Sequence, residues 1–152
     1  MKTAWLAMLA ALGCAACSSD DDTGSGPPIS DGPLAGVVGG KLWSFRSGET
    51  NPQQSQGDPR FWGEAYAEAT AACSATPTLD FLILNVPREV GSYDLGFDLT
   101  ATFVIQPSDN LGATKGRLVV EEITASSIRG GANIEFDPQN KVNGHFTLAI
   151  CP

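Results

Sequence analysis

Four cysteines and a single histidine are the residues of this chain with the most versatile chemistry. Cys14 and Cys17 form a C-x-x-C pair, the spacing of thioredoxin-like redox motifs and of half a zinc site. A redox pair lies where a strand meets a helix, and a zinc site needs two further ligands at close spacing. This pair instead follows an apolar run at residues 4–12, His145 is the only histidine, and Cys73 and Cys151 each stand alone rather than in a second cysteine pair. We therefore expect no metal and no cofactor.

The N-terminus is typical of a secretory signal peptide. Lys2 supplies a positive charge, and residues 4–12 (AWLAMLAAL) carry no charged or strongly polar side chain. This run is too short to span a bilayer, which takes about 20 helical residues. A basic start, a short apolar run and small residues after it match the signal-peptide pattern. No later segment stays apolar for 18 residues, so the sequence predicts no transmembrane helix.

Two cysteines follow the end of the apolar run, and each comes directly after a small residue. Cys17 follows two alanines, and Cys14 follows a glycine. This pattern resembles the lipobox of bacterial lipoproteins, whose cysteine receives diacylglycerol. The resemblance implies a signal peptide at residues 1–16 and lipidation of Cys17, with Cys14 as the alternative. The residue after the cysteine, Ser18, is not the aspartate that retains lipoproteins at the inner membrane, so the outer membrane is the expected location.

Charge and composition limit the partners. Without Lys2 the chain carries eight basic and 17 acidic residues, a formal charge of −9. This balance argues against nucleic acid and against electrostatic adhesion to anionic lipid, so we expect membrane contact through the covalent lipid. The segment after Cys17 is rich in Ser, Asp, Gly and Pro, and we expect residues 17–40 to form a disordered tether. A first edge strand within residues 34–38 (LAGVV) is the alternative for its end.

Residues 41–152 have the size of one domain and the pattern of a β protein. Short runs of β-branched and aromatic residues alternate with clusters of Gly, Pro, Asn and Asp. The clearest alternation places Val142, Phe146 and Leu148 on one face. We predict an all-β domain, a single antiparallel β-sandwich or meander barrel of about seven to eight strands. The expected strands lie at residues 41–47, 79–86, 92–95, 101–106, 116–124, 127–136 and 142–150.

Residues 60–72 (RFWGEAYAEATAA) are the ambiguous segment. The preceding proline and the run of Ala and Glu favour a helix, whereas the aromatic residues and Gly63 favour a strand. We expect a strand through Ala67 and keep a helix as the alternative.

The two late cysteines are expected to form a disulfide. In an exported protein they lie in an oxidising compartment, and one N-terminal cysteine is expected to carry lipid. A bridge between Cys73 and Cys151 would close a long loop. In the chain-entropy account it would stabilise the folded state by about 4.5 kcal/mol.

The domain also has a recognisable layout. It opens with G-K-x-W, has a mid-chain cysteine and a V-P-x-x-x-G-x-Y-x-L stretch, and ends in N-x-V-x-G-x-F-x-x-x-x-C. The residues concerned are Gly40, Lys41, Trp43, Cys73, Val86, Pro87, Gly91, Tyr93, Leu95, Asn140, Val142, Gly144, Phe146 and Cys151. This layout resembles a loose group of small Gram-negative lipoproteins of unknown function. The resemblance implies export and a β-rich body, and it brings no activity with it.

Three polar residues are candidates for catalysis, but their positions in the predicted strands argue against a catalytic role. His145 lies, by strand parity, on the face opposite Phe146, where it meets solvent. Glu121 and Glu122 are adjacent, so a regular strand points them to opposite faces. They cannot then form the carboxylate pair of a glycosidase. We expect no catalytic residue here.

The remaining acidic pairs are not expected to form a site. Glu64 and Glu68 share a face that we read as solvated. Asp94 and Asp98 supply too few oxygen ligands for a calcium site. Four aromatic residues are the candidates for ligand binding, because two or three of them facing outward together would form a platform. They are Trp43, Trp62, Tyr66 and Tyr93.

These observations predict a lipid-anchored envelope protein whose β domain is a non-enzymatic binding or structural module. Its partner is an envelope protein or a small molecule that the sequence does not identify. The alternative is a small-ligand carrier with an apolar barrel cavity of several hundred Å³, whereas a structural module has a filled core. An envelope hydrolase is a remote alternative, because the chain has no G-x-S-x-G, H-E-x-x-H or P-loop motif.

Overall fold

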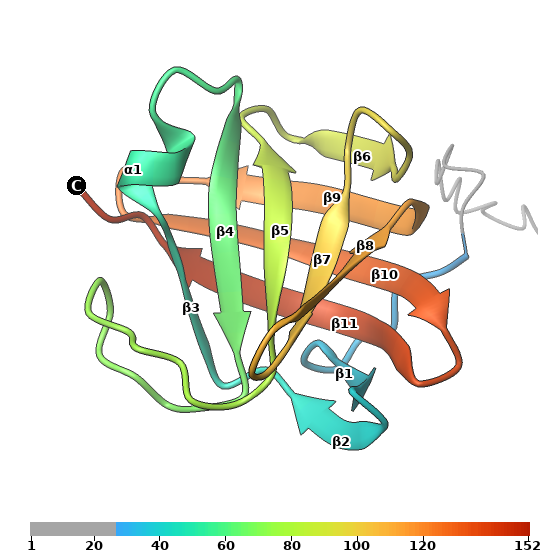
Figure 1. Ribbon diagram of the computed structural model, residues 1–152. Coiled ribbons are helices and arrows are strands. Elements are labelled where there is room, and N and C mark those ends of the chain that lie inside the picture. The colour runs from blue at the N-terminus through green and yellow to red at the C-terminus, as the bar shows by residue number, and fades with distance from the viewer. Residues whose placement is uncertain (1–26) are drawn as a thin grey trace, which may run out of the picture.

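The computed structural model describes residues 27–152, which form a curled β-sheet with one short helix (Figure 1). The prediction of an all-β domain is confirmed. The expected signal peptide, Cys14, Cys17 and the start of the tether lie outside the described residues. The elements are β1 (Ala35–Val38), β2 (Lys41–Ser44), β3 (Ser47–Thr50), α1 (Pro52–Ser55), β4 (Arg60–Tyr66), β5 (Phe81–Pro87), β6 (Gly91–Asp94), β7 (Ala101–Ile105), β8 (Asp109–Ala113), β9 (Lys115–Ile123), β10 (Ser127–Asp137) and β11 (Asn140–Ala149).

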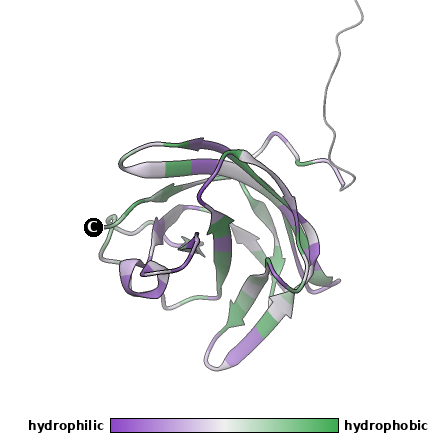
Figure 2. Cartoon of the chain, turned by 90° about the horizontal axis from the view of Figure 1, so that it is seen from above, coloured by the Kyte–Doolittle hydropathy of each residue, from purple (hydrophilic) through white to green (hydrophobic). Residues whose placement is uncertain are grey.

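The strands belong to one mixed sheet rather than to a simple antiparallel sandwich. The path runs β6-β9-β10-β11-β3-β4-β5-β7-β8, and β1, with β2 beyond it, adds to β11. Neighbours pair antiparallel except β11 and β3, which are parallel where Ala149 lies opposite Glu49. In Figure 1, β4, β5, β7 and β8 lie in front of β9, β10 and β11, and from above the strands curl around a common interior (Figure 2).

The expected count of about seven to eight strands is therefore too low for the described residues, which hold eleven. β3 and β8 were not expected, β1 was expected only as the alternative edge strand, and all three have only four or five residues. β3 and β8 contain glycine and polar side chains, β1 is the short run AGVV, and none of the three alternates clearly, so tertiary pairing rather than local pattern makes them strands.

The ambiguous segment at residues 60–72 contains strand β4, so the strand interpretation is confirmed and the helix is wrong. Gly63 has a packing reason. A Cβ on Gly63, or on Gly48 of the neighbouring β3, would overlap the methyl groups of Leu148. Leu148 of β11 is fully buried. These two glycines therefore let the sheet close over Leu148 where it turns from β11 through β3 to β4.

The core lies between the two halves of the curled sheet, and its side chains come from both. The alternation predicted for β11 is confirmed, because Val142, Phe146 and Leu148 are all buried. No buried side-chain nitrogen or oxygen atom of the described residues lacks a hydrogen-bond partner. The largest fully buried apolar side chains are Tyr66, Phe103, Leu34, Leu82, Leu84, Leu118, Ile128, Ile134 and Leu148.

The chain joins the sheet earlier than expected. β1 pairs with β11, so the alternative edge strand within residues 34–38 is confirmed in part, and the sheet begins before Lys41. The reason is that β11 has an open edge whose polar backbone groups need partners. His145 uses this edge: its N–H donates to the Gly32 carbonyl at 2.8 Å, and its carbonyl accepts from the Leu34 N–H at 2.7 Å.

The residues just before β1 lie on the outer face of β10 and β11. The Pro28 carbonyl accepts hydrogen bonds from the side-chain amides of Asn133 at 3.1 Å and Asn143 at 3.2 Å. Ile29 lies so close over Gly131 that a Cβ there would come within 2.9 Å of it. The final part of the expected tether is thus held against the domain.

Within residues 27–152 no helix has the length and apolar character needed to cross a membrane.

Candidate functional site

A β-bulge brings two carboxylates to one face of the sheet. In the pairing of β9 with β10, Arg129 lies opposite Glu122 and the next residue, Gly130, lies opposite Val120. Glu121 is the extra residue of this register shift. A bulge puts two residues of one strand opposite one of its partner and re-aims their side chains. The expectation that Glu121 and Glu122 point to opposite faces is therefore wrong.

Both carboxylates contact the same guanidinium group. Arg129 Nη1 lies 3.6 Å from Glu121 Oε2, and Arg129 Nε lies 3.4 Å from Glu122 Oε2. His145 of β11 joins them, with its Nδ1 atom 3.0 Å from Glu121 Oε1. His145 lies on the outer face as predicted, and its side chain is 37% exposed. These four residues form a polar cluster drawn from three adjacent strands.

The cluster borders a hollow of about 300 Å³, which we call the bulge hollow. Its polar wall contains Glu121, Arg129, His145 and Thr147, and its apolar wall contains Pro33, Phe45 and Phe146. The hollow lies where β11 changes partner: the pairing with β1 ends at Asn143, and the pairing with β3 is at Ala149. The divergence of β1 and β3 leaves this opening beside β11.

The cluster has part of the geometry of a general base. A carboxylate that accepts from Nδ1–H orients an imidazole and leaves Nε2 free to accept a proton. Glu121 and His145 are placed in this way. A nucleophilic mechanism also needs a hydroxyl or thiol within hydrogen-bond reach of Nε2. The hydroxyl in this hollow is that of Thr147, and no hydrogen bond joins it to His145 within residues 27–152.

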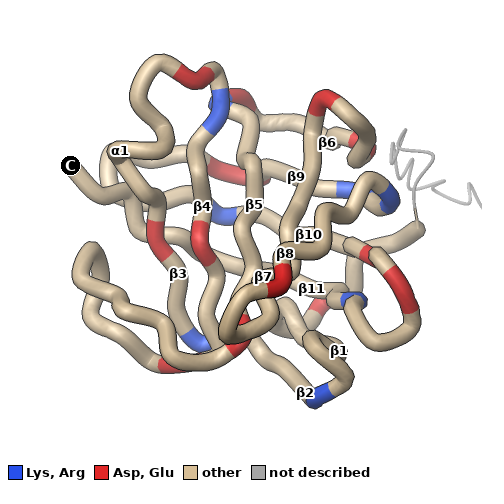
Figure 3. Tube along the Cα trace, in the orientation of Figure 1, with Lys and Arg blue, Asp and Glu red and all other residues tan. Residues whose placement is uncertain are grey.

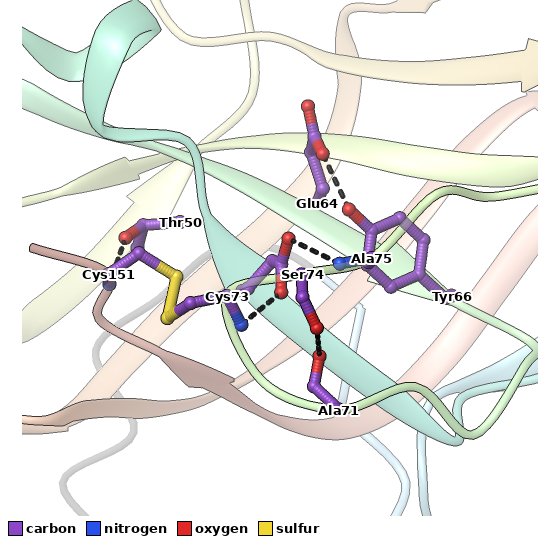
Figure 4. Close-up of a disulfide and its surroundings, with 9 residues drawn as sticks. Thr50, Glu64, Tyr66, Ala71, Cys73, Ser74, Ala75 and Cys151 are labelled. Carbon is purple, nitrogen blue, oxygen red and sulfur yellow. Dashed lines mark hydrogen bonds between the residues drawn. A yellow bond between two sulfur atoms is a disulfide. The ribbon is translucent and has the colours of Figure 1, made fainter.

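The predicted disulfide between Cys73 and Cys151 is confirmed, with the two Cα atoms 5.4 Å apart (Figure 4). Side chains of β3 form hydrogen bonds with the backbone at both cysteines. The carboxylate of Glu49 accepts from the Cys73 N–H at 2.6 Å and from the Ala75 N–H at 3.3 Å. The Cys151 N–H donates to Thr50 Oγ1 at 3.0 Å. The bridge and Glu49 together fasten the loop after β4 and the C-terminus to β3.

Glu64 and Tyr66 form a second polar pair close to this bridge. The Tyr66 hydroxyl donates to Glu64 Oε2 at 2.5 Å, and Glu49 lies opposite Glu64 on the neighbouring strand (Figure 4). Burial, which leaves Tyr66 only 1% exposed, raises the pKa of its phenol, and the hydrogen bond and negative charge of Glu64 raise it further. Tyr66 is thus a neutral donor, and Glu64 is not the purely solvated side chain that was expected.

We expect Tyr66 to resist ionisation in the folded protein. Because its folded pKa is raised, the stability it contributes is present below the unfolded phenol value of about 10 and is lost as the pH rises above it. Absorbance at 295 nm should show one of the two tyrosines of the chain ionising only as the near-ultraviolet circular dichroism is lost. Tyr66→Phe should remove that late step. Reversible ionisation of both tyrosines with unchanged dichroism would contradict the assignment.

The four aromatic candidates do not come together as a ligand platform. Trp43 is buried and donates from Nε1 to the Asp80 carbonyl at 3.0 Å. Tyr93, on β6, donates its hydroxyl to the Glu89 carbonyl. Trp62 shares one face of β4 with Tyr66, but the burial of Tyr66 leaves Trp62 alone there. The large aromatic side chains therefore serve mainly the structure.

The other acidic candidates also have structural partners. Glu68 accepts hydrogen bonds from the Thr78 and Leu79 N–H groups and the Thr78 hydroxyl, and the Thr78 bonds lower its pKa. The backbone of Asp94 pairs in register with that of Arg117, and the backbone carbonyl of Asp98 accepts from Arg60 Nη1. No group of three or more His, Cys, Asp or Glu side chains within residues 27–152 is placed to hold a metal ion.

Sequence reasoning missed the site because it assumed a regular strand. The sequence does contain a sign of the bulge: VVEEI at residues 119–123 interrupts the alternation with two adjacent acids. Comparison of the chain with protein-family models, with curated proteins and with solved structures finds no match.

Proposed function

We propose that this protein is a lipid-anchored protein of the bacterial cell envelope, delivered to the outer membrane, whose β domain is a non-enzymatic binding module. The observation that carries the proposal is the disulfide between Cys73 and Cys151. Such bridges persist in oxidising compartments and are rare in the cytosol of mesophiles. An exported body agrees with the signal-like N-terminus and with the lipobox-like residues before Cys17.

The packing of the interior favours a binding surface over a carrier cavity. A carrier needs an enclosed apolar space of several hundred Å³. Fully buried side chains such as Leu82, Phe103 and Ile128 fill the space between the two halves of the sheet instead. None of these three lines any of four hollows of about 200–600 Å³ among the described residues, which border loops and strand edges. A ligand carrier remains the second proposal, with less support.

Charge disfavours a nucleic-acid partner. Lys and Arg positions are scattered along the chain among the strands and interspersed with acidic positions (Figure 3). Nucleic-acid binding draws most of its affinity from a gathered basic surface. A protein or small-molecule partner in the envelope fits this surface better.

The anchor can be tested by labelling with radioactive palmitate and by intact mass. We expect label in the wild type and in Cys14→Ala, and none in Cys17→Ala. The mass of the wild type should correspond to a chain that begins at residue 17 and carries acyl groups. Cys73→Ala is the matched control, since it also removes a thiol but lies in the β domain. Label in both N-terminal single variants, or in neither the wild type nor Cys14→Ala, would overturn the assignment of Cys17.

A further inference from the structure

The edge of β11 beside the bulge hollow already holds one extended segment. Pro33 forms an isolated parallel bridge with His145, and both backbone polar groups of His145 bond to residues 32–34. Backbone groups that point to the same edge alternate along a strand, so those of Thr147 point there as well. Among the described pairings, Thr147 has no strand partner on that side. The next backbone groups on this edge are thus those of Thr147, two residues beyond His145.

The charges at the hollow are unequal. Glu121 lines the hollow and Glu122 lies beside it on Arg129, and Arg129 meets these two carboxylates only at 3.6 and 3.4 Å. Glu122 and Arg129 are more than half exposed, so exchange with a second cation costs little desolvation. A ligand with an ammonium or guanidinium group would balance the second carboxylate.

The other wall is apolar. Pro33, Phe45 and Phe146 line it, and Phe146 is continuous with the core. A hollow of about 300 Å³ accepts one large side chain rather than a drug-sized molecule. An apolar wall below a carboxylate rim favours a residue pair, one apolar and one basic.

We propose that the bulge hollow binds an extended segment of another envelope protein. The segment places one aromatic or large aliphatic side chain against Phe45 and Phe146 and a neighbouring Lys or Arg against Glu121 and Glu122. This inference rests on the proposed function, because it requires a binding module that meets other envelope proteins. It names the surface and the chemistry of the partner.

Charge argues against the chain as its own partner. The sequence before the described residues carries Asp20, Asp21 and Asp22, which the carboxylates of the hollow repel. The whole chain has a formal charge of −8, so a second copy also meets the hollow with like charge. A foreign segment with a basic residue is the complementary occupant.

The single histidine makes the test direct. His145 Hε1 gives the only histidine signal of the chain, so its shift in the proton NMR spectrum reports this hollow alone. The full chain, purified from membranes in a non-ionic detergent, is titrated with acetyl-Lys-Phe-Ala-amide. We expect a saturable shift with a dissociation constant of about 1–10 mM, the affinity of one buried side chain plus one exposed ion pair.

Three probe peptides separate the contributions. Acetyl-Glu-Phe-Ala-amide reverses the charge and should bind more weakly, and acetyl-Lys-Ala-Ala-amide removes the apolar anchor and should produce no saturable shift. Glu121→Gln and Glu122→Gln should each weaken the first peptide about two- to five-fold. The control is Glu135→Gln, which removes the same charge from the same face but at a position opposite Lys115 and Lys141.

The proposal is overturned if the Lys-Phe peptide produces no saturable shift, or if the Glu-Phe peptide binds as well. It is also overturned if N-acetylglucosamine shifts His145 and the peptides do not, since the hollow would then bind sugar. Palmitate labelling is independent of all these results. A chain that is lipidated but does not bind the peptide fails only this inference, whereas a chain without lipid fails the proposed function.

Discussion

Replacing Cys73 and Cys151 together with alanine is expected to lower the free energy of unfolding by about 4.5 kcal/mol. The two residues are 78 positions apart, so the bridge restricts most of the domain in its unfolded state. Urea denaturation under non-reducing conditions, with circular dichroism as the signal, measures the change. The effect is a large part of the total stability of a small domain, which is about 5–15 kcal/mol.

Two control comparisons test whether the loss of stability comes from the bridge itself. Reduction of the wild type should reproduce the loss of the double variant, and reduction of the double variant should change nothing. The single variants should match the double variant, because either one opens the same bridge. A double variant within 1 kcal/mol of the wild type would show that Glu49 and Thr50 hold the loop and the C-terminus without it.

The disulfide and the bulge hollow are connected by one strand. β11 carries His145 and Thr147 at the hollow and ends at Ala149, two residues before Cys151. The bridge therefore holds the end of the strand that forms one wall of the site. Loss of the bridge should raise hydrogen exchange at Leu148 more than at Val142, because both residues pair with β10 but Leu148 lies three residues from Cys151 and Val142 lies nine.

Side-chain periodicity and the number of cysteines left to pair explain which features could be predicted from the sequence. Residues 142–150 alternate so regularly that the inward face of β11 follows from side-chain periodicity. The bridge follows because Cys73 and Cys151 are the cysteines that remain after one N-terminal cysteine is assigned to lipid. Both inferences depend on residue type and spacing alone.

Features set by distant pairing could not be predicted in this way. The Glu121 bulge is a property of the register between β9 and β10, and neither strand alone reveals it. β1 is a strand because β11 has an open edge, although its own residues AGVV read as the end of a tether. The candidate site lies where these two effects meet, and for that reason it was missed.

Gly63 and Leu148 allow the sharpest test of the packing. Leu148→Ala is expected to cost about 3–5 kcal/mol, since it leaves a cavity in a fully buried site. Gly63→Ala alone is expected to cost about 1–3 kcal/mol, because its new methyl group would overlap the Leu148 side chain. In the double variant that methyl group enters the space that Leu148 leaves. The combined loss should therefore fall short of the sum by about 1 kcal/mol or more.

The control for this cycle is Val142→Ala combined with Gly63→Ala. Val142 is also buried on β11, but it lies six residues from Leu148, which is about 20 Å along a strand. These two changes share no contact and should add within about 0.5 kcal/mol. Additivity in both cycles would mean that Gly63 does not make room for Leu148. The close turn of the sheet from β11 to β4 would then need a different cause.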